Sequence, residues 1–132
     1  MRITGLDHLV LTVRDMDVSV TFYSDALGLT PVTFGQNRRG LLVGAQRINL
    51  HEAGRELAPY ASRPVPGAAD LCLASDTPVE VVLARLTRAG VTIELGPVER
   101  VGAAGPMRSF YVRDPDGNLV EVGCYDCALD YL

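Results

Sequence analysis

An internal repeat is the feature of this sequence that most limits how the chain can fold. His8 and Asp70 are 62 positions apart, and the same distance separates Gly28 from Gly90. Apolar residues recur at this offset too, in the pairs Leu9 and Leu71, Leu11 and Leu73, and Val20 and Val82. A strand, a helix and a glycine that stops the helix therefore appear twice in the same order. We conclude that the chain contains two copies of one structural module.

The first copy begins with a short strand at 6–13 that is rich in β-branched residues. Successive side chains of a strand point to opposite faces of its sheet. One face then carries Leu9, Leu11 and Val13. The other face carries His8, Val10 and Thr12. This alternation predicts one apolar face that packs in the core and one face that presents a histidine.

A helix is predicted to follow this strand. Asp15 is a suitable N-cap and Gly28 a suitable stop, so the helix should span about 17–27. Its buried stripe is expected to consist of Val18, Phe22 and Ala26. Three short strands are then predicted at 30–34, 40–43 and 46–51.

The second copy follows a proline-containing segment. Residues 52–67 lack clear periodicity and contain three prolines, which indicates a linker. Strands are predicted at 70–74, 92–98, 108–113 and 118–124. The chain is therefore expected to be a single α+β domain, 1–132, of two tandem βαβββ modules. Module one spans about 5–51, the linker 52–67, module two about 68–124 and a tail 125–132.

Three local patterns belong to the second module. Thr77-Pro78-Val79-Glu80 has the sequence of a capping box with proline at the first helical position. The helix should run to about Ala89, with Val79, Val82, Leu83 and Leu86 on its apolar side. Residues 114–118 (DPDGN) predict a tight turn. The glycine-containing segment 100–106 is either a mobile flap or a plain hairpin connection.

Composition excludes several classes of partner. The net charge is −4, and the 12 basic residues are all arginines without a dense cluster, so nucleic acid and membranes are not expected as partners. No apolar run approaches the ~18 residues of a membrane helix. The N-terminal residues do not have the pattern of a signal peptide, so we expect a cytoplasmic protein.

The cysteines are expected to be structural or incidental. There are 3, Cys72, Cys124 and Cys127, and an odd number does not suggest a disulfide framework. Cys124 and Cys127 have CxxC spacing, but the sequence offers no second CxxC or nearby histidines that would complete a zinc site.

Several stretches together resemble the vicinal oxygen chelate superfamily, also called the glyoxalase/bleomycin resistance/dioxygenase fold. They are residues 7–13 (DHLVLTV), Phe22-Tyr23 with Leu27-Gly28-Leu29, and residues 113–122 (RDPDGNLVEV). The stretches 48–52, 63–67 and 96–102 resemble the branch often labelled lactoylglutathione-lyase-like. The resemblance covers nearly the whole chain. It implies a curved, U-shaped mixed sheet with the helices outside.

The resemblance also implies a divalent metal, which could be Ni, Zn, Co, Mn or Fe. In that superfamily the metal is held by residues from the first and last strands of each module, and it chelates two neighbouring oxygens of the substrate. His8 and Glu121 match two of these positions. The corresponding first-strand position of module two is Asp70, which is either a ligand or a turn residue.

The fourth position falls on Asn49, and His51 lies two residues further on the same strand face. His51 is a candidate ligand or proton shuttle, and a purely structural role is the alternative. His8 could likewise be a buried histidine that bonds to the backbone, and Glu121 could face solvent. A tight metal site needs at least three protein ligands. Whether this chain binds a metal therefore depends on the residues at positions 49, 51 and 70, in addition to His8 and Glu121.

The leading functional hypothesis is a metal-dependent lyase or isomerase of glyoxalase type. Its substrate would be a small α-oxo or α-hydroxy carbonyl compound, possibly as a thiol adduct, and Glu121 and His51 are the candidate catalytic residues. The alternative is a metal-free protein that binds a drug or metabolite. A third hypothesis is an extradiol-type dioxygenase. Asp70 argues against this activity, because that chemistry uses two histidines and one carboxylate.

The resemblance implies a homodimer, because two-module relatives commonly assemble their sites from two subunits. Four arginines, Arg38, Arg39, Arg100 and Arg108, are candidates for contact with an anionic substrate.

Overall fold

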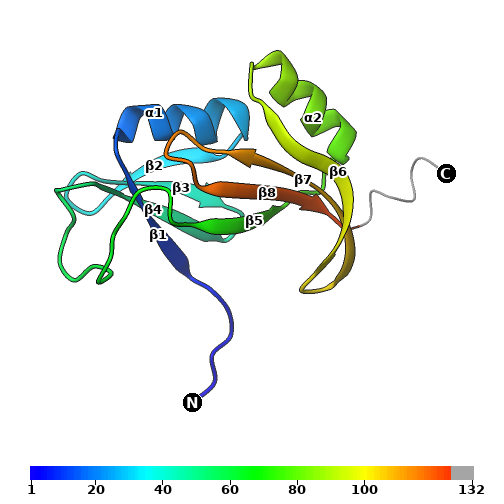
Figure 1. The fold of residues 1–132 in the computed structure, drawn as a ribbon. Coiled ribbons are helices and arrows are strands. Elements are labelled where there is room, and N and C mark those ends of the chain that lie inside the picture. Colours follow the sequence, from blue (N-terminus) through cyan, green and yellow to red (C-terminus); the bar gives the residue numbers. More distant parts are fainter. Residues whose placement is uncertain (126–132) are drawn as a thin grey trace. The chain divides into compact units, whose positions relative to one another are not determined.

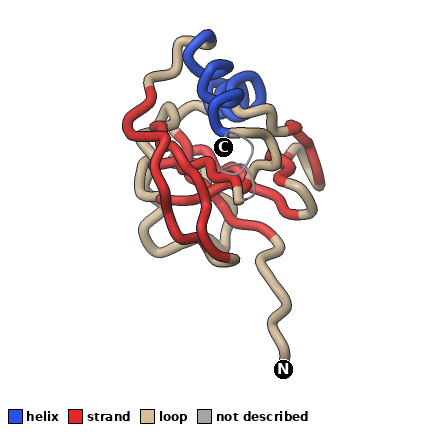
Figure 2. Tube along the Cα trace, turned by 90° about the vertical axis from the view of Figure 1, so that its right-hand side faces the viewer, coloured by secondary structure: helices blue, strands red, loops and turns tan. Residues whose placement is uncertain are grey.

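The structure, a computed structural model, describes residues 1–125 (Figure 1). The chain divides into two compact units, Met1–Ala68 and a second unit that begins at Ala69. Residues 1–7 precede the first strand and extend away from it in both views (Figures 1 and 2). Among the described residues, no helix combines the length and the apolar character needed to span a membrane. The predicted tail, apart from Tyr125, lies outside the described residues.

The first unit is a four-stranded mixed sheet with a helical segment on one face (Figure 1). Its elements are β1 (His8–Val13), α1 (Met16–Thr21), the π-helical turn η1 (Phe22–Ala26), β2 (Thr30–Phe34), β3 (Arg38–Val43) and β4 (Gln46–Glu52). The strand order is β1-β4-β3-β2, and β1 runs parallel to β4 while the other neighbours are antiparallel. The core on the helical face consists of Leu11, Val13, Tyr23, Ala26, Leu41, Ile48 and Leu50.

The second unit repeats this topology. Its elements are β5 (Asp70–Ala74), α2 (Val79–Arg88), β6 (Ile93–Gly102), β7 (Gly105–Arg113) and β8 (Leu119–Cys124). The strand order is β5-β8-β7-β6, and β5 runs parallel to β8. The same crossed order in both sheets confirms the predicted α+β fold of tandem βαβββ modules.

The first helical segment begins as predicted but buries a different stripe. Asp15 caps α1 through its side chain, which accepts a hydrogen bond from the backbone N of Val18. The buried residues are Ser19, Tyr23 and Ala26, whereas Val18 is 50% exposed. The predicted stripe was therefore wrong at Val18. Neighbouring residues lie about 100° apart around a helix, so Val18 turns to solvent once Ser19 and the large Tyr23 ring face the sheet.

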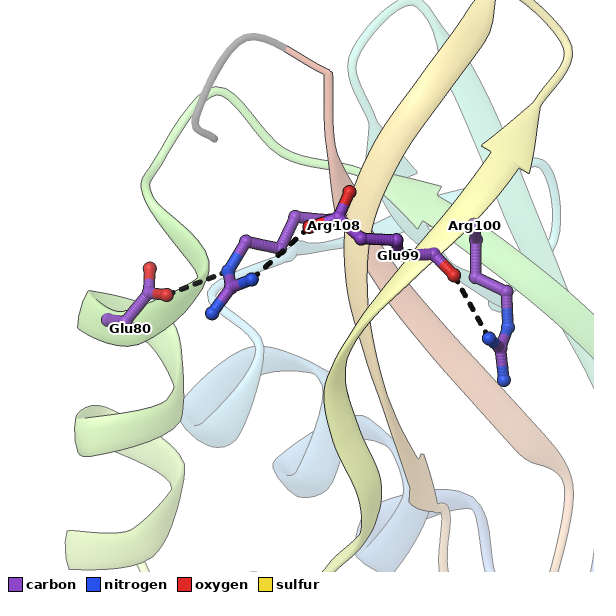
Figure 3. A network of polar contacts seen from close by, with 4 residues as sticks. All are labelled: Glu80, Glu99, Arg100 and Arg108. Carbon is purple, nitrogen blue, oxygen red and sulfur yellow. Dashed lines mark hydrogen bonds and ion pairs between the residues drawn. The ribbon is translucent and has the colours of Figure 1, made fainter. Parts of the chain in front are cut away.

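The predicted capping box of the second helix is also wrong. Pro78 occupies the N-cap position of α2, and no side chain caps the helix there. Glu80 instead bonds to β7: its Oε1 accepts a hydrogen bond from Nε of Arg108, which also pairs with Glu99 (Figure 3). A guanidinium that offers a charge-assisted bond competes successfully with a local backbone N–H. The predicted apolar side is confirmed at Val79 and Leu86, both fully buried.

The segment between β6 and β7 is a hairpin. β6 extends to Gly102, which pairs directly with Gly105, so residues 103–104 alone form the connection. The hairpin alternative is therefore confirmed for 100–106. β6 also carries two register shifts, between Ile93 and Leu95 and between Leu95 and Val98, which the sequence pattern did not reveal.

The turn at 114–118 ties the two central strands of the second unit to a third segment. Asp114 Oδ1 accepts hydrogen bonds from the backbone N atoms of Asp116 and Asn118, both at 2.9 Å. The Asn118 side chain donates to Asp114 Oδ2 at 2.7 Å, and its Oδ1 accepts from the backbone N of Ala69 at 2.8 Å. Ala69 immediately precedes β5, so this network fixes the register of β5 against β8.

One cysteine differs from expectation. Cys124, which is 2% exposed at the end of β8, is disulfide-bonded. The three cysteines did not suggest a disulfide in the sequence, because residue counts and spacing do not show which sulfurs come within bonding distance. Cys127 lies outside the described residues.

Candidate functional site

In the first unit the strand register gathers the candidate residues on the sheet face opposite the helical segment. β1 and β4 run parallel, with His8 beside Arg47, Val10 beside Asn49 and Thr12 beside His51. Residues paired in this way project from the same face of a sheet. The predicted alternation of β1 therefore holds, and His8 and His51 share one face.

His8 lies at one end of this face and is engaged with its neighbour. Its side chain is 44% exposed, and Nδ1 lies 2.7 Å from Oδ1 of Asp7. This hydrogen bond is the main reason that the pKa of Asp7 is lowered; the charge of His8 adds to it, and the charge of Arg47 contributes least. The contact leaves Nε2 of His8 as the nitrogen for a ligand.

His51 lies at the other end of the face and is 7% exposed. Its Nε2 is buried and has no hydrogen-bond partner within residues 1–125. The residue lines a cavity of about 430 Å³ whose other walls are Val10, Thr12, Pro59, Tyr60, Ala61 and Pro64. A buried nitrogen without a partner is costly, so His51 is the residue of this face at which a bound group would offset that cost.

Asn49 lies between these two histidines and is 2% exposed. Its Oδ1 accepts a hydrogen bond of 2.6 Å from Nε of Arg47. The oxygen that would bind a metal is thus already engaged by a cation, and Asn49 positions Arg47 in this structure.

In the second unit Glu121 occupies the centre of the sheet. It pairs with Cys72 on β5 and with Tyr111 on β7, so the three side chains share a face. Asp70 projects from the same face of β5 and is exposed. Tyr111 is held by Arg100, whose Nε donates a hydrogen bond of 3.0 Å to the tyrosine hydroxyl.

A second cavity, of about 330 Å³, lies over this face. The residues that line it are Cys72, Ala74, Arg100, Val101, Gly102, Ala103, Met107, Glu121 and Tyr125. The half-buried carboxylate of Glu121 and the guanidinium of Arg100 are its charged groups. The cavity therefore presents a carboxylate for proton transfer and a cation that favours anionic groups.

The environment of the Cys72 thiol raises its pKa. Burial, together with the charge and hydrogen bonding of Glu121, raises its pKa to about 11. In EDTA-treated protein at pH 8, the fraction of Cys72 present as thiolate should be about 100-fold smaller than for an ordinary cysteine. The greater nucleophilicity of a more basic thiolate offsets part of this loss of reactivity. We expect Cys72 to react with iodoacetamide about tenfold more slowly than a free thiol, as measured by mass spectrometry of its peptide.

The matched control for this reaction is Glu121→Gln, which removes the charge while keeping the shape of the side chain. It should lower the pKa of Cys72 and accelerate alkylation. Reaction of the unmodified protein at the rate of a free thiol would contradict the assignment.

The candidate metal ligands do not form a ready cluster. Within residues 1–125, no group of three or more His, Cys, Asp or Glu side chains lies close enough to hold a metal ion. In the first unit, His51 lies four positions beyond the residue paired with His8, which is about 13 Å along the strand. In the second unit, Asp70 and Glu121 are offset by two positions, about 7 Å. Each unit thus offers separated ligands, of which the unpartnered Nε2 of His51 fits a metal best.

Sequence reasoning missed three contributors to these sites. The segment 52–67, interpreted as a linker, supplies Tyr60 and the proline walls of the first cavity. Cys72 was set aside as incidental although its position two residues after Asp70 places it on the same strand face. Arg47 was not singled out, although its position two residues before Asn49 places it on the same strand face as Asn49.

The fold and these two faces define a class of protein. The family described as the Glyoxalase/Bleomycin resistance protein/Dioxygenase superfamily matches residues 5–122, and the chain belongs to it.

Relatives with known sequences and structures are similar over most of the chain. The virulence protein STM3117 of Salmonella typhimurium is 52% identical over 125 residues, 95% of this chain and 87% of the relative. Its crystal structure superposes with a TM-score of 0.92 and covers 95% of this chain and 99% of that one. Glutathione transferase FosA of Serratia marcescens is 33% identical over 89% of this chain and 79% of its own length. The lactoylglutathione lyase structure from Agrobacterium tumefaciens has a TM-score of 0.71 at 25% identity, with 93% and 95% of the two chains covered.

Proposed function

We propose that this protein is a metal-dependent lyase or isomerase of glyoxalase type. Its substrate is a small α-oxo or α-hydroxy carbonyl compound, either free or as a thiol adduct. The thiol is suggested by two similar proteins, whose names are glutathione transferase and lactoylglutathione lyase. The protein would act as a homodimer in the cytoplasm.

The residues proposed as metal ligands are His8, Glu121, Asp70 and His51, as the resemblance to the superfamily implies. His8 and His51 belong to the first unit, and Asp70 and Glu121 to the second. The chemistry supplied by such a divalent metal is polarisation of a carbonyl oxygen, which lowers the cost of negative charge there.

The protein's own side chains carry the proton. Glu121 accepts a proton from the hydroxyl-bearing carbon beside the carbonyl group and returns it to the carbonyl carbon. The hydroxyl proton passes to the former carbonyl oxygen, so one C–H and one O–H bond are broken and one of each is formed. Cys72, a thiol beside that carboxylate, stays protonated at neutral pH because its pKa is raised.

The observation that carries this proposal is the state of His51. It is buried on the strand face of the first cavity with an unpartnered Nε2, and a histidine in this state is suited to binding a metal or a substrate oxygen. A purely structural histidine would be expected to have both nitrogens satisfied.

The test combines metal content with turnover. Protein purified without chelator is expected to hold about one divalent ion per chain by elemental analysis. It should turn over the adduct of methylglyoxal with a thiol, lose activity in EDTA, and regain it with Ni, Co, Mn, Zn or Fe. Failure to bind any of these metals would exclude the proposal. Light scattering in solution checks the dimer.

One observation favours a second function. The described residues contain no cluster of three metal-ligating side chains, so the two cavities could serve a metal-free binding protein for a drug or metabolite. That function predicts ligand binding that is unchanged by EDTA, without conversion of the ligand.

A further inference from the structure

Arg47 is held in one orientation on the sheet face of the first unit. Its Nε donates to Oδ1 of Asn49 at 2.6 Å, and Asn49 is 2% exposed. Its guanidinium carbon lies 3.6 Å from the centre of the Phe34 ring. The guanidinium of Arg38 lies over the same ring at 4.9 Å. An aromatic ring and a buried amide therefore fix an arginine whose side chain would otherwise be mobile.

The glycine on the neighbouring strand makes room for this arrangement. Gly40 is buried on β3 and pairs with Asn49. A Cβ at this position would lie 3.3 Å from both Cγ and Cδ of Arg47 and 2.9 Å from the carbonyl oxygen of Ile48. The Arg47 side chain thus passes over Gly40 because the strand has no side chain there.

Neither of the two arginines on Phe34 makes an ion pair with the residues that the structure describes. Arg39, the next residue along from Arg38, lies on the opposite face and pairs with Asp17 at 2.7 Å. Asp7 is close enough for the charge of Arg47 to contribute slightly to its lowered pKa, but its Oδ1 is bonded to His8. Two cations are therefore held together without a carboxylate to balance them.

We propose that Arg47, with Arg38 beside it, binds an oxyanion group of the substrate, either a carboxylate or a phosphonate. Nε of Arg47 is used by Asn49, so its two terminal nitrogens remain for a bidentate contact with two oxygens. The guanidinium lies over Phe34 on β2, and His8 lies on β1 at the other edge of the same sheet face, so an anion held by Arg47 anchors one end of a small molecule on the face that carries a candidate metal ligand. This inference rests on the proposed function and narrows its substrate to α-oxo or α-hydroxy compounds that carry an acidic group.

The experiment uses the full chain without metal, uniformly labelled with ¹⁵N, and follows the Nε–H resonance of Arg47. Pyruvate and methylphosphonate are the anionic probes, and hydroxyacetone is the neutral one. We expect saturable shifts with an anion but not with hydroxyacetone, and the anion that binds more tightly identifies the group. Arg47→Gln should weaken anion binding by about tenfold or more, because a bidentate contact is lost. Binding to this variant is measured from the shifts of the backbone amides around Asn49.

Arg39→Gln is the matched control, since it removes the same charge from the adjacent strand on the other face. Its binding should stay within about twofold of the unmodified protein, because exposed charges that lie apart interact weakly. If Arg47→Gln does not fold, Arg38→Gln tests the same site and should also weaken binding. Equal weakening by Arg39→Gln, or no saturable shift, overturns the inference. Because no metal is present, anion binding is tested separately from metal-dependent turnover.

Discussion

Glu121→Gln is expected to lower kcat/KM for the methylglyoxal–thiol adduct by about 10³-fold while the protein stays folded. Glutamine keeps the shape of the side chain. It cannot accept the substrate proton, and general-base catalysis typically contributes between about 10² and 10⁴-fold. The measurement is steady-state turnover together with the thermal unfolding temperature. The loss would fall on kcat and kcat/KM together if the base acts only in the transition state.

Glu99→Gln is the matched control for this substitution. Glu99 lies on β6 of the same unit, where it pairs with Arg108 and is 65% exposed (Figure 3). An exposed ion pair of this kind contributes little, so turnover should remain within about twofold. Full activity in Glu121→Gln would exclude this carboxylate as the base.

The largest expected effect on stability comes from Gly96→Ala. Gly96 has φ +119°, and a Cβ there would lie 2.7 Å from Cα and Cβ of Phe110 and 2.8 Å from the carbonyl oxygen of Ser109. These atoms belong mainly to the backbone of β7, which cannot move aside without breaking the sheet. We expect the free energy of unfolding to fall by more than about 4 kcal/mol, or the variant to be insoluble.

Gly105→Ala separates this clash from backbone strain alone. Gly105 has φ +128°, and a Cβ there would have no heavy atom within 4 Å. Only the strain of a positive φ remains, so we expect a loss of about 1–3 kcal/mol in urea denaturation. Equal losses in the two variants would show that the close approach of β6 and β7 at Phe110 has no energetic weight.

Much of the fold was accessible from the sequence because its signals are local. The period of two in the first strand, the N-cap at Asp15 and the stops at Gly28 and Gly90 depend on a few neighbouring residues, and all four appear in the structure. The failures involve partners far along the chain. Glu80 bonds to Arg108, 28 residues away, instead of capping its own helix. The stripe of the first helix shifted to Ser19 and Tyr23 because the sheet beneath selects the buried side.

The residues of the candidate site also separate into those that local patterns predicted and those that depend on contacts between distant segments. Alternation placed His8 with Val10 and Thr12 on one face of its strand, and His51 with Asn49 on one face of another. The register of β1 against β4 then brought the two histidines to one face of the sheet. Alternation could not show that Cys72 lies beside Glu121, because that depends on the register set by Asn118 and Ala69. Nor could it show that Arg47 reaches Phe34, since those residues lie on different strands.

The repeat by itself determined that this chain folds as two βαβββ modules, because each copy carries its own alternation, helix and stop. Its register also equated His8 with Asp70, whereas the other ligand positions came from the resemblance to the superfamily. Tertiary structure alone decided the state of those positions. Nε2 of His51 is buried with no hydrogen-bond partner within residues 1–125, Asn49 is engaged by Arg47, and burial together with Glu121 raises the pKa of Cys72. Burial and charge depend on what packs nearby in space, whereas strand and helix patterns depend on what lies nearby in the sequence.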